Sequence, residues 1–262
     1  MILIYGHLKW FSPSATETAK CTEIITKTTG VVARHLNKRI SLPISLVLSR
    51  RAVRPNTVTY FNMLVGVLSG VFASLGSIGG ILWGAVFFQL ASVLDGVDGE
   101  VAKLNGTESR FGQWLDTISD CSTYFIFLTG LTAGLYRYLG DGGVLIIGAL
   151  ALVSSFLFLC LMLNYLKKNS NSGSLIAFEK GIVNGAVREE RGFFSHFIHY
   201  GRYLVKKDAF TFIFMILALT GYYELIPYLA AVGTTSASLV ILWLTLKKKP
   251  AFNLAEGTHA KY

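Results

Sequence analysis

The chain has 262 residues, of which 52% are hydrophobic and only 15% charged, and its mean hydropathy is +0.52. A soluble domain of this size needs more charged side chains to cover its surface, so the composition excludes an ordinary soluble protein and indicates a membrane protein. The net charge is +9, but the cationic residues cluster between apolar segments, which indicates membrane topology and not nucleic-acid binding.

The first 54 residues are too polar to cross a membrane. Residues 1–29 show no clear periodicity, and the short apolar run at the start lacks the length and cleavage site of a signal peptide, so we predict an N-terminal cytoplasmic segment. Residues 30–54 interleave apolar side chains with Arg and Lys. This mixture predicts an interfacial amphipathic helix that lies in the headgroup layer.

Six apolar segments follow, most of them near the ~20 residues that a helix needs to cross a bilayer. We therefore predict an all-α polytopic fold whose membrane domain covers residues 55–250, with a cytoplasmic tail at 251–262. The expected transmembrane helices are 58–77, 79–94, 114–135, 144–166, 209–223 and 225–246. Gly66 and Gly70 have the GxxxG spacing that lets transmembrane helices approach closely.

The positions of the basic residues predict the orientation of these segments. All but one of the 24 Lys and Arg residues fall on the same side of the six predicted spans, and Arg137 is the exception. By the positive-inside rule, both termini are cytoplasmic. In a prokaryote this topology would place the protein in the inner membrane.

Four aspartates stand where the second span ends and the third begins. Asp95 and Asp98 are spaced i,i+3, and Asp116 and Asp120 are spaced i,i+4, so each pair shares one helix face. A short link makes the two helices antiparallel neighbours, which predicts that the carboxylates converge near the cytoplasmic surface. Such a cluster needs a cation, and oxygen ligands suit Mg²⁺, Mn²⁺ or Ca²⁺. Alternatively, the four aspartates could simply lie at helix ends that face water. Four acidic residues at this spacing, in a chain with few acidic residues, argue against that alternative.

The spacing of these residues resembles the motif of the CDP-alcohol phosphotransferase, or phosphatidyltransferase, family. That motif reads Asp-x-x-Asp-Gly-x-x-Ala-Arg, eight or nine residues, then Gly-x-x-x-Asp-x-x-x-Asp. Lys103 stands where the family has Arg. The fixed positions are matched by Asp95, Asp98, Gly99, Ala102, Gly112, Asp116 and Asp120. Residues 34–41 and 98–102 look most like the branch that includes the di-myo-inositol phosphate synthases.

The resemblance implies a metal-dependent transferase that releases CMP. Asp95, Asp98 and Asp116 would bind metal, and Asp120 would combine metal binding with general-base duty. Mg²⁺, with Mn²⁺ as the alternative, would be the cofactor, as two ions. Nucleotide-binding positions would be Asn56, Thr59, Gly99, Ala102, Lys103 and Gly112. Lys103 keeps the charge of Arg but loses its two-pronged geometry. The family also implies a homodimer.

The sequence identifies the substrates less clearly than it identifies the site residues. Arg202, Lys206 and Lys207 precede the fifth span and are expected to bind the acceptor, although they could equally be topogenic charges. The chain would act in phospholipid synthesis, or would join two polar alcohols as in di-inositol phosphate synthesis. A divalent cation transporter is the alternative from another class, and it predicts carboxylates near mid-bilayer and an inverted repeat. We find neither in the sequence.

Overall fold

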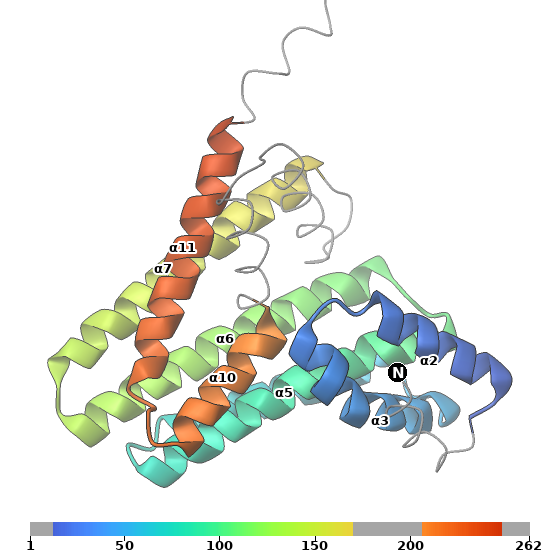
Figure 1. The fold of residues 1–262 in the computed structure, drawn as a ribbon, viewed down its shortest axis with the longest axis horizontal. Helices are drawn as coiled ribbons and strands as arrows, with labels where there is room; N and C mark the ends of the chain where they lie inside the picture. The colour runs from blue at the N-terminus through green and yellow to red at the C-terminus, as the bar shows by residue number, and fades with distance from the viewer. Residues whose placement is uncertain (1–12, 170–205, 248–262) are drawn as a thin grey trace, which may run out of the picture.

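The computed structural model describes residues 13–169 and 206–247, and within these ranges all regular secondary structure is helical (Figure 1). The predicted all-α class is therefore confirmed for the described residues. The helices are α2 (Ala15–Lys27), the π-helix η2 (Ala33–Asn37), α3 (Lys38–Arg50), α4 (Pro55–Ala73), α5 (Ile78–Asn105), α6 (Arg110–Leu139), α7 (Gly142–Asn169), α10 (Lys207–Leu219) and α11 (Leu225–Lys247).

Local sequence explains where the central helices begin and end. Pro55 opens α4 in the first-turn position that proline favours. Ser77 and Ser109 cap the starts of α5 and α6 by accepting backbone N–H groups. Both helices end at a glycine in the left-handed conformation, Gly106 with φ +67° and Gly140 with φ +69°. Because only residues 106–109 separate α5 from α6, the two helices run as neighbours.

Helix α4 lies very close to α6, and small residues permit this. A Cβ added to Gly130 would sit 2.2 Å from the Gly70 carbonyl oxygen, and one added to Gly134 would sit 1.9 Å from the Ala73 carbonyl oxygen. The close packing predicted from the GxxxG spacing of Gly66 and Gly70 is thus confirmed. This backbone contact fixes α6, which carries two of the aspartates.

The main core joins α5, α6 and α10. Phe88 and Phe127 stack with ring centroids 4.1 Å apart, and Phe214 of α10 packs against both rings. Helices α7 and α11 lie side by side (Figure 1), and they add Val144, Ala151, Ile226 and Ala230 to the same core. They are joined by a 2.7 Å hydrogen bond between Ser154 and Thr234.

Each of the six predicted membrane segments lies mostly on one helix, although 58–77 and 209–223 run past the ends of α4 and α10. Only some of these helices are by themselves long and apolar enough to cross a membrane. Three of the described helices are long and apolar enough to cross a membrane, namely Pro55–Ala73, Ile78–Asn105 and Gly142–Asn164. Helix α6 is long, yet its first half carries aspartates, while the described α10 has only 13 residues. The count of six spans and the headgroup position of α3 therefore stay predictions.

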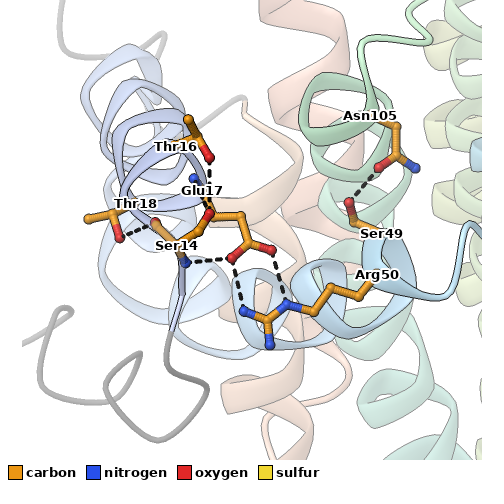
Figure 2. Close-up of polar contacts among 7 residues, drawn as sticks. All are labelled: Ser14, Thr16, Glu17, Thr18, Ser49, Arg50 and Asn105. Carbon is orange, nitrogen blue, oxygen red and sulfur yellow. Dashed lines mark hydrogen bonds and ion pairs between the residues drawn. The ribbon is translucent and has the colours of Figure 1, made fainter.

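Helix α2 was not predicted. It begins with a capping box in which Ser14 accepts the N–H of Glu17 and Glu17 accepts the N–H of Ser14. Its apolar face packs on α3 and on the end of α5 through Cys21, Ile24, Ile25, Leu42, Leu46 and Leu104. Figure 2 shows the polar edge of this contact, where the guanidinium of Arg50 on α3 donates to both carboxylate oxygens of Glu17, at 3.0 and 2.9 Å. Residues 15–27 are thus a packed element and not an irregular segment.

Candidate active site

Three of the predicted aspartates meet where α5 and α6 face each other. Asp95, Asp116 and Asp120 each place a carboxylate oxygen within 4.8 Å of the other two. Asp95 comes from the C-terminal half of α5, and the other two come from successive turns of α6. The shared face predicted for Asp116 and Asp120 is therefore seen in three dimensions, and three of the four predicted carboxylates converge.

Lys207, the first residue of α10, reaches into this cluster. Its ammonium donates to the Asp120 carboxylate and lies 3.0 Å from Asp95 Oδ1. The lysine side chain is only 18% exposed, and the two carboxylates are similarly shielded. A shielded ion pair is far less weakened by water and salt than one on the surface. Lys207 was predicted to bind an acceptor, and its pairing with the aspartates was not foreseen.

Asp98 does not belong to the set of three whose carboxylate oxygens all lie within 4.8 Å of one another. It is 5% exposed, and it accepts hydrogen bonds from Thr59 Oγ1 at 2.5 Å and from the Gly99 N–H at 2.6 Å. Thr59 belongs to α4, so this contact ties α4 to the helix that carries the motif. The role of Asp98 as a metal ligand stays a prediction.

The donor set fits a hard divalent cation. It consists of carboxylate oxygens, which Mg²⁺ and Mn²⁺ favour. The Oδ1 atom of Asp116 is buried and accepts no hydrogen bond from any described residue, and Oδ1 of Asp95 has only the ion pair with Lys207. One ammonium does not neutralise three carboxylates. Asp95, Asp116 and Asp120 are therefore the described residues that would hold a cation.

The residues expected to contact the nucleotide come from α4, α5 and α6, and Thr59 among them is buried. A Cβ added to Gly99 would meet nothing within 4 Å, so there is open space in front of this glycine. At Gly112 an added Cβ would lie 3.5 Å from Asn56 Oδ1. Asn56 of α4 and Gly112 of α6, which are both predicted to contact the nucleotide, are thus neighbours. Ala102 is half-buried and Lys103 is exposed.

The expected acceptor residues differ in their placement. Lys207 lies in the aspartate cluster, whereas Lys206 donates to Thr29 Oγ1 at 2.5 Å. Arg202 falls outside the described residues. Lys206 therefore links α10 to the segment before η2.

Two buried polar groups beside the site were missed at the sequence level. Glu100 is 1% exposed and takes hydrogen bonds from α3. Gln89 of α5 donates to Asn37 at 3.2 Å and accepts from Thr211 of α10 at 2.8 Å. A polar residue inside an apolar helix signals a buried partner. The sequence held that signal for Gln89, but it did not identify the partner.

Comparison with known proteins identifies relatives that are similar to part of this chain. The chain is 36% identical over 129 residues to a bifunctional IPC transferase and DIPP synthase of Aquifex aeolicus, covering 47% of this chain and 29% of the relative. It is 31% identical over 91 residues to a phosphatidylinositol phosphate synthase of Mycobacteroides abscessus, covering 35% of this chain and 40% of the relative. The matched region thus spans less than half the length of each of these relatives.

The family comparison covers most of the chain. Residues 52–247 match the CDP-alcohol phosphatidyltransferase family, and this range contains α4 to α11 and every described aspartate of the cluster. The resemblance noted in the motif is thereby confirmed. The chain belongs to the CDP-alcohol phosphatidyltransferase family and is an enzyme of that family.

Proposed function

We propose that the protein transfers a phosphatidyl group from a CDP-linked lipid donor onto a polar alcohol and releases CMP, in phospholipid synthesis. The observation that carries this proposal is the cluster of Asp95, Asp116, Asp120 and Lys207 at the family motif. Asp120 would accept the proton of the acceptor hydroxyl as its oxygen attacks the phosphorus that bears the lipid. The bond from that phosphorus to the CMP oxygen then breaks.

The remaining residues of the site have separate roles in this proposal. Asp95, Asp98, Asp116 and Asp120 would hold Mg²⁺ as two ions, with Mn²⁺ as the alternative. A bound divalent cation supplies charge neutralisation for the donor pyrophosphate and the departing CMP. Lys207 would contact an anionic acceptor, because its ammonium already lies on Asp120. The open space at Gly99 and the pair Asn56–Gly112 would receive cytidine.

The surroundings of the site favour a lipid substrate. Helix α3 packs on α5 beside the motif and leaves several apolar side chains exposed, among them Ile40 at 46% and Ile44 at 36%. An amphipathic helix of this kind lies at the boundary of headgroups and acyl chains, where a lipid donor would enter. The phosphatidylinositol phosphate synthases among the relatives agree with this assignment. The DIPP synthases among the relatives support the alternative reaction, in which two polar alcohols are joined.

The topology belongs to the same proposal. We place α4, α5, α6, α7, α10 and α11 across the membrane, with both termini and the aspartates on the cytoplasmic side. The support is the distribution of Lys and Arg, which leaves Arg137 alone near the opposite end of α6. A homodimer is proposed from the family alone.

The test is CMP release by purified protein in detergent with Mg²⁺. CDP-diacylglycerol and CDP-inositol are supplied separately with inositol, inositol phosphate and glycerol phosphate as acceptors. Asp120→Asn is the test variant, and Asp141→Asn is its matched control because Asp141 lies in the link between α6 and α7. CMP from wild type and Asp141→Asn, but not from Asp120→Asn, supports a transferase.

The productive donor distinguishes the two enzyme versions. CMP with CDP-diacylglycerol supports the lipid product, and CMP only with CDP-inositol overturns it in favour of joining polar alcohols. If no donor yields CMP from folded protein, while Mn²⁺ flux appears in proteoliposomes, the transporter alternative replaces the enzyme proposal.

A further inference from the structure

Glu100 is a buried carboxylate inside the catalytic motif that the proposed chemistry does not use. It occupies one of the variable motif positions, between the aspartate-bearing turn and Ala102. Only 1% of the residue is exposed. Burying a carboxylate in this way costs several kcal/mol unless it is paired and hydrogen-bonded.

Among the described residues, the hydrogen-bond partners of Glu100 all come from helix α3. Lys38 Nζ lies 2.5 Å from Glu100 Oε1, and Ser41 Oγ donates to the same oxygen at 2.7 Å. Ser45 Oγ donates to Oε2 at 2.6 Å. The three donors are spaced i, i+3 and i+7, so they form one face of α3. The carboxylate is therefore satisfied on both oxygens by a single helix.

Gly96 lets α3 lie this close to α5. A Cβ added there would be 3.3 Å from Lys38 Nζ and 3.4 Å from Glu100 Oε1. Gly96 is not a fixed position of the family motif, and α3 precedes the family match, which begins at residue 52. The α3 side of this contact therefore lies outside the family match.

The geometry around α5 suggests what this contact does. Asp98 and Glu100 are two residues apart on the helix, so their side chains project about 200° apart around its axis. Asp98 is bonded to Thr59 of α4 on one side, and Glu100 is bonded to α3 on the other. The two contacts together oppose rotation of α5 about its own axis.

We propose that Glu100 is a positioning residue that anchors the motif helix to α3 and thereby sets the orientation of Asp95 and Asp98. Active-site groups must be held within about 0.5 Å and 10–20° of their productive geometry. A roll of α5 by that amount would move both carboxylates relative to Asp116 and Asp120 on α6. In this proposal α3 supports catalysis by fixing the orientation of α5, and it is not assigned a role in contacting the substrate.

The experiment rests on the proposed transferase and measures kcat, KM and Mn²⁺ binding for Glu100→Gln in detergent. Gln keeps hydrogen-bonding atoms but leaves the Lys38 ammonium buried without its counter-charge. We expect kcat to fall tenfold or more, the KM of the acceptor to change less than threefold, and Mn²⁺ affinity measured by EPR to fall several-fold. Lys38→Met combined with Glu100→Gln removes the unpaired charge and should restore kcat to within threefold of wild type.

Two controls separate positioning from folding. Glu17→Gln breaks another carboxylate bridge to α3, at Arg50, without touching α5, so its kcat should stay within twofold of wild type. If Glu100→Gln does not fold, Ser41→Ala with Ser45→Ala is the milder variant, and it should lower kcat severalfold. Wild-type kcat and Mn²⁺ affinity in folded Glu100→Gln, or in the double serine variant, with a lower Tm would overturn the proposal. Wild-type protein without CMP release would instead contradict the transferase.

Discussion

The ammonium of Lys207 contacts the carboxylates of both Asp95 and Asp120, and so joins the start of α10 to the ends of α5 and α6 that form the aspartate cluster. This one side chain places a positive charge beside the proposed general base. It also takes up oxygens that a metal ion would use. Lys207 and a divalent cation are thus expected to compete for Asp95 and to share the site's negative charge.

Replacing Lys207 should distinguish acceptor binding from charge pairing. In Lys207→Met we expect the KM of a phosphorylated acceptor to rise tenfold or more, because the ammonium that meets its phosphate is lost. The KM of an uncharged acceptor should change less than threefold, and Mn²⁺ should bind at least as tightly as in wild type. Steady-state CMP release and EPR titration measure these quantities.

Lys20→Met is the matched control for this variant. Lys20 is an exposed lysine that donates to the Leu104 carbonyl at 2.6 Å, and it lies outside the cluster. Its acceptor KM should equal that of wild type. Equal KM values for the phosphorylated acceptor in Lys207→Met and wild type would show that Lys207 only pairs with the aspartates.

Gly99 offers a test of the nucleotide side that does not disturb the fold. An added Cβ meets nothing within 4 Å, and alanine is favoured over glycine within a helix by about 1 kcal/mol. Gly99→Ala should therefore keep or raise the Tm, while the KM of the CDP donor rises severalfold because the methyl group fills the proposed cytidine space. An unchanged donor KM would place the nucleotide elsewhere.

Much of this site could be predicted from sequence because helical spacing places side chains on faces. The i,i+3 and i,i+4 aspartates needed only a short link to become neighbours, and the glycine and serine signals around 106–109 supply one. Asp98 shows the limit of this reasoning. Its spacing puts it near Asp95, but its orientation is decided by Thr59 on another helix.

The contacts that sequence reasoning missed all join segments distant in the chain. Lys207 and Asp120 are 87 residues apart, and Glu100 and Lys38 are 62 apart. Periodicity says nothing about such pairs, because packing of whole helices brings them together. Helix α2 is different, since its Ser14–Glu17 capping box was readable. This helix was not predicted because its apolar residues follow only a weak helical pattern.

The contact between α4 and α6 predicts a stability effect at Gly130. A Cβ there would lie 2.2 Å from the Gly70 carbonyl oxygen, which is backbone and cannot rotate away. Gly130→Ala should lower the free energy of unfolding by about 1–3 kcal/mol, as overpacking does. Gly79→Ala is the control, because an added Cβ there meets nothing and glycine is unfavourable in a helix. Thermal unfolding in detergent should rank Gly130→Ala well below wild type and Gly79→Ala at or above it.

The Glu17–Arg50 bridge predicts a pH dependence confined to the N-terminal helices. The Arg50 guanidinium and the Ser14 N–H lower the pKa of Glu17 from 4.5 to about 2. A carboxyl whose pKa is lowered on folding stabilises the fold above its unfolded pKa, and that contribution is lost as pH falls from 4.5 towards 2. Because the pair is exposed to water and salt, its contribution is small.

Glu17→Gln isolates this contribution. At pH 7 the variant should unfold at a slightly lower temperature than wild type. The gap should narrow below pH 4.5 and close towards pH 2, as the folded wild-type carboxyl takes up its proton. Arg50→Gln should show the same convergence, because it removes the other half of the pair. A gap that stays constant down to pH 3 would contradict the lowered pKa of Glu17, because both Arg50 and the Ser14 N–H favour the ionised carboxylate.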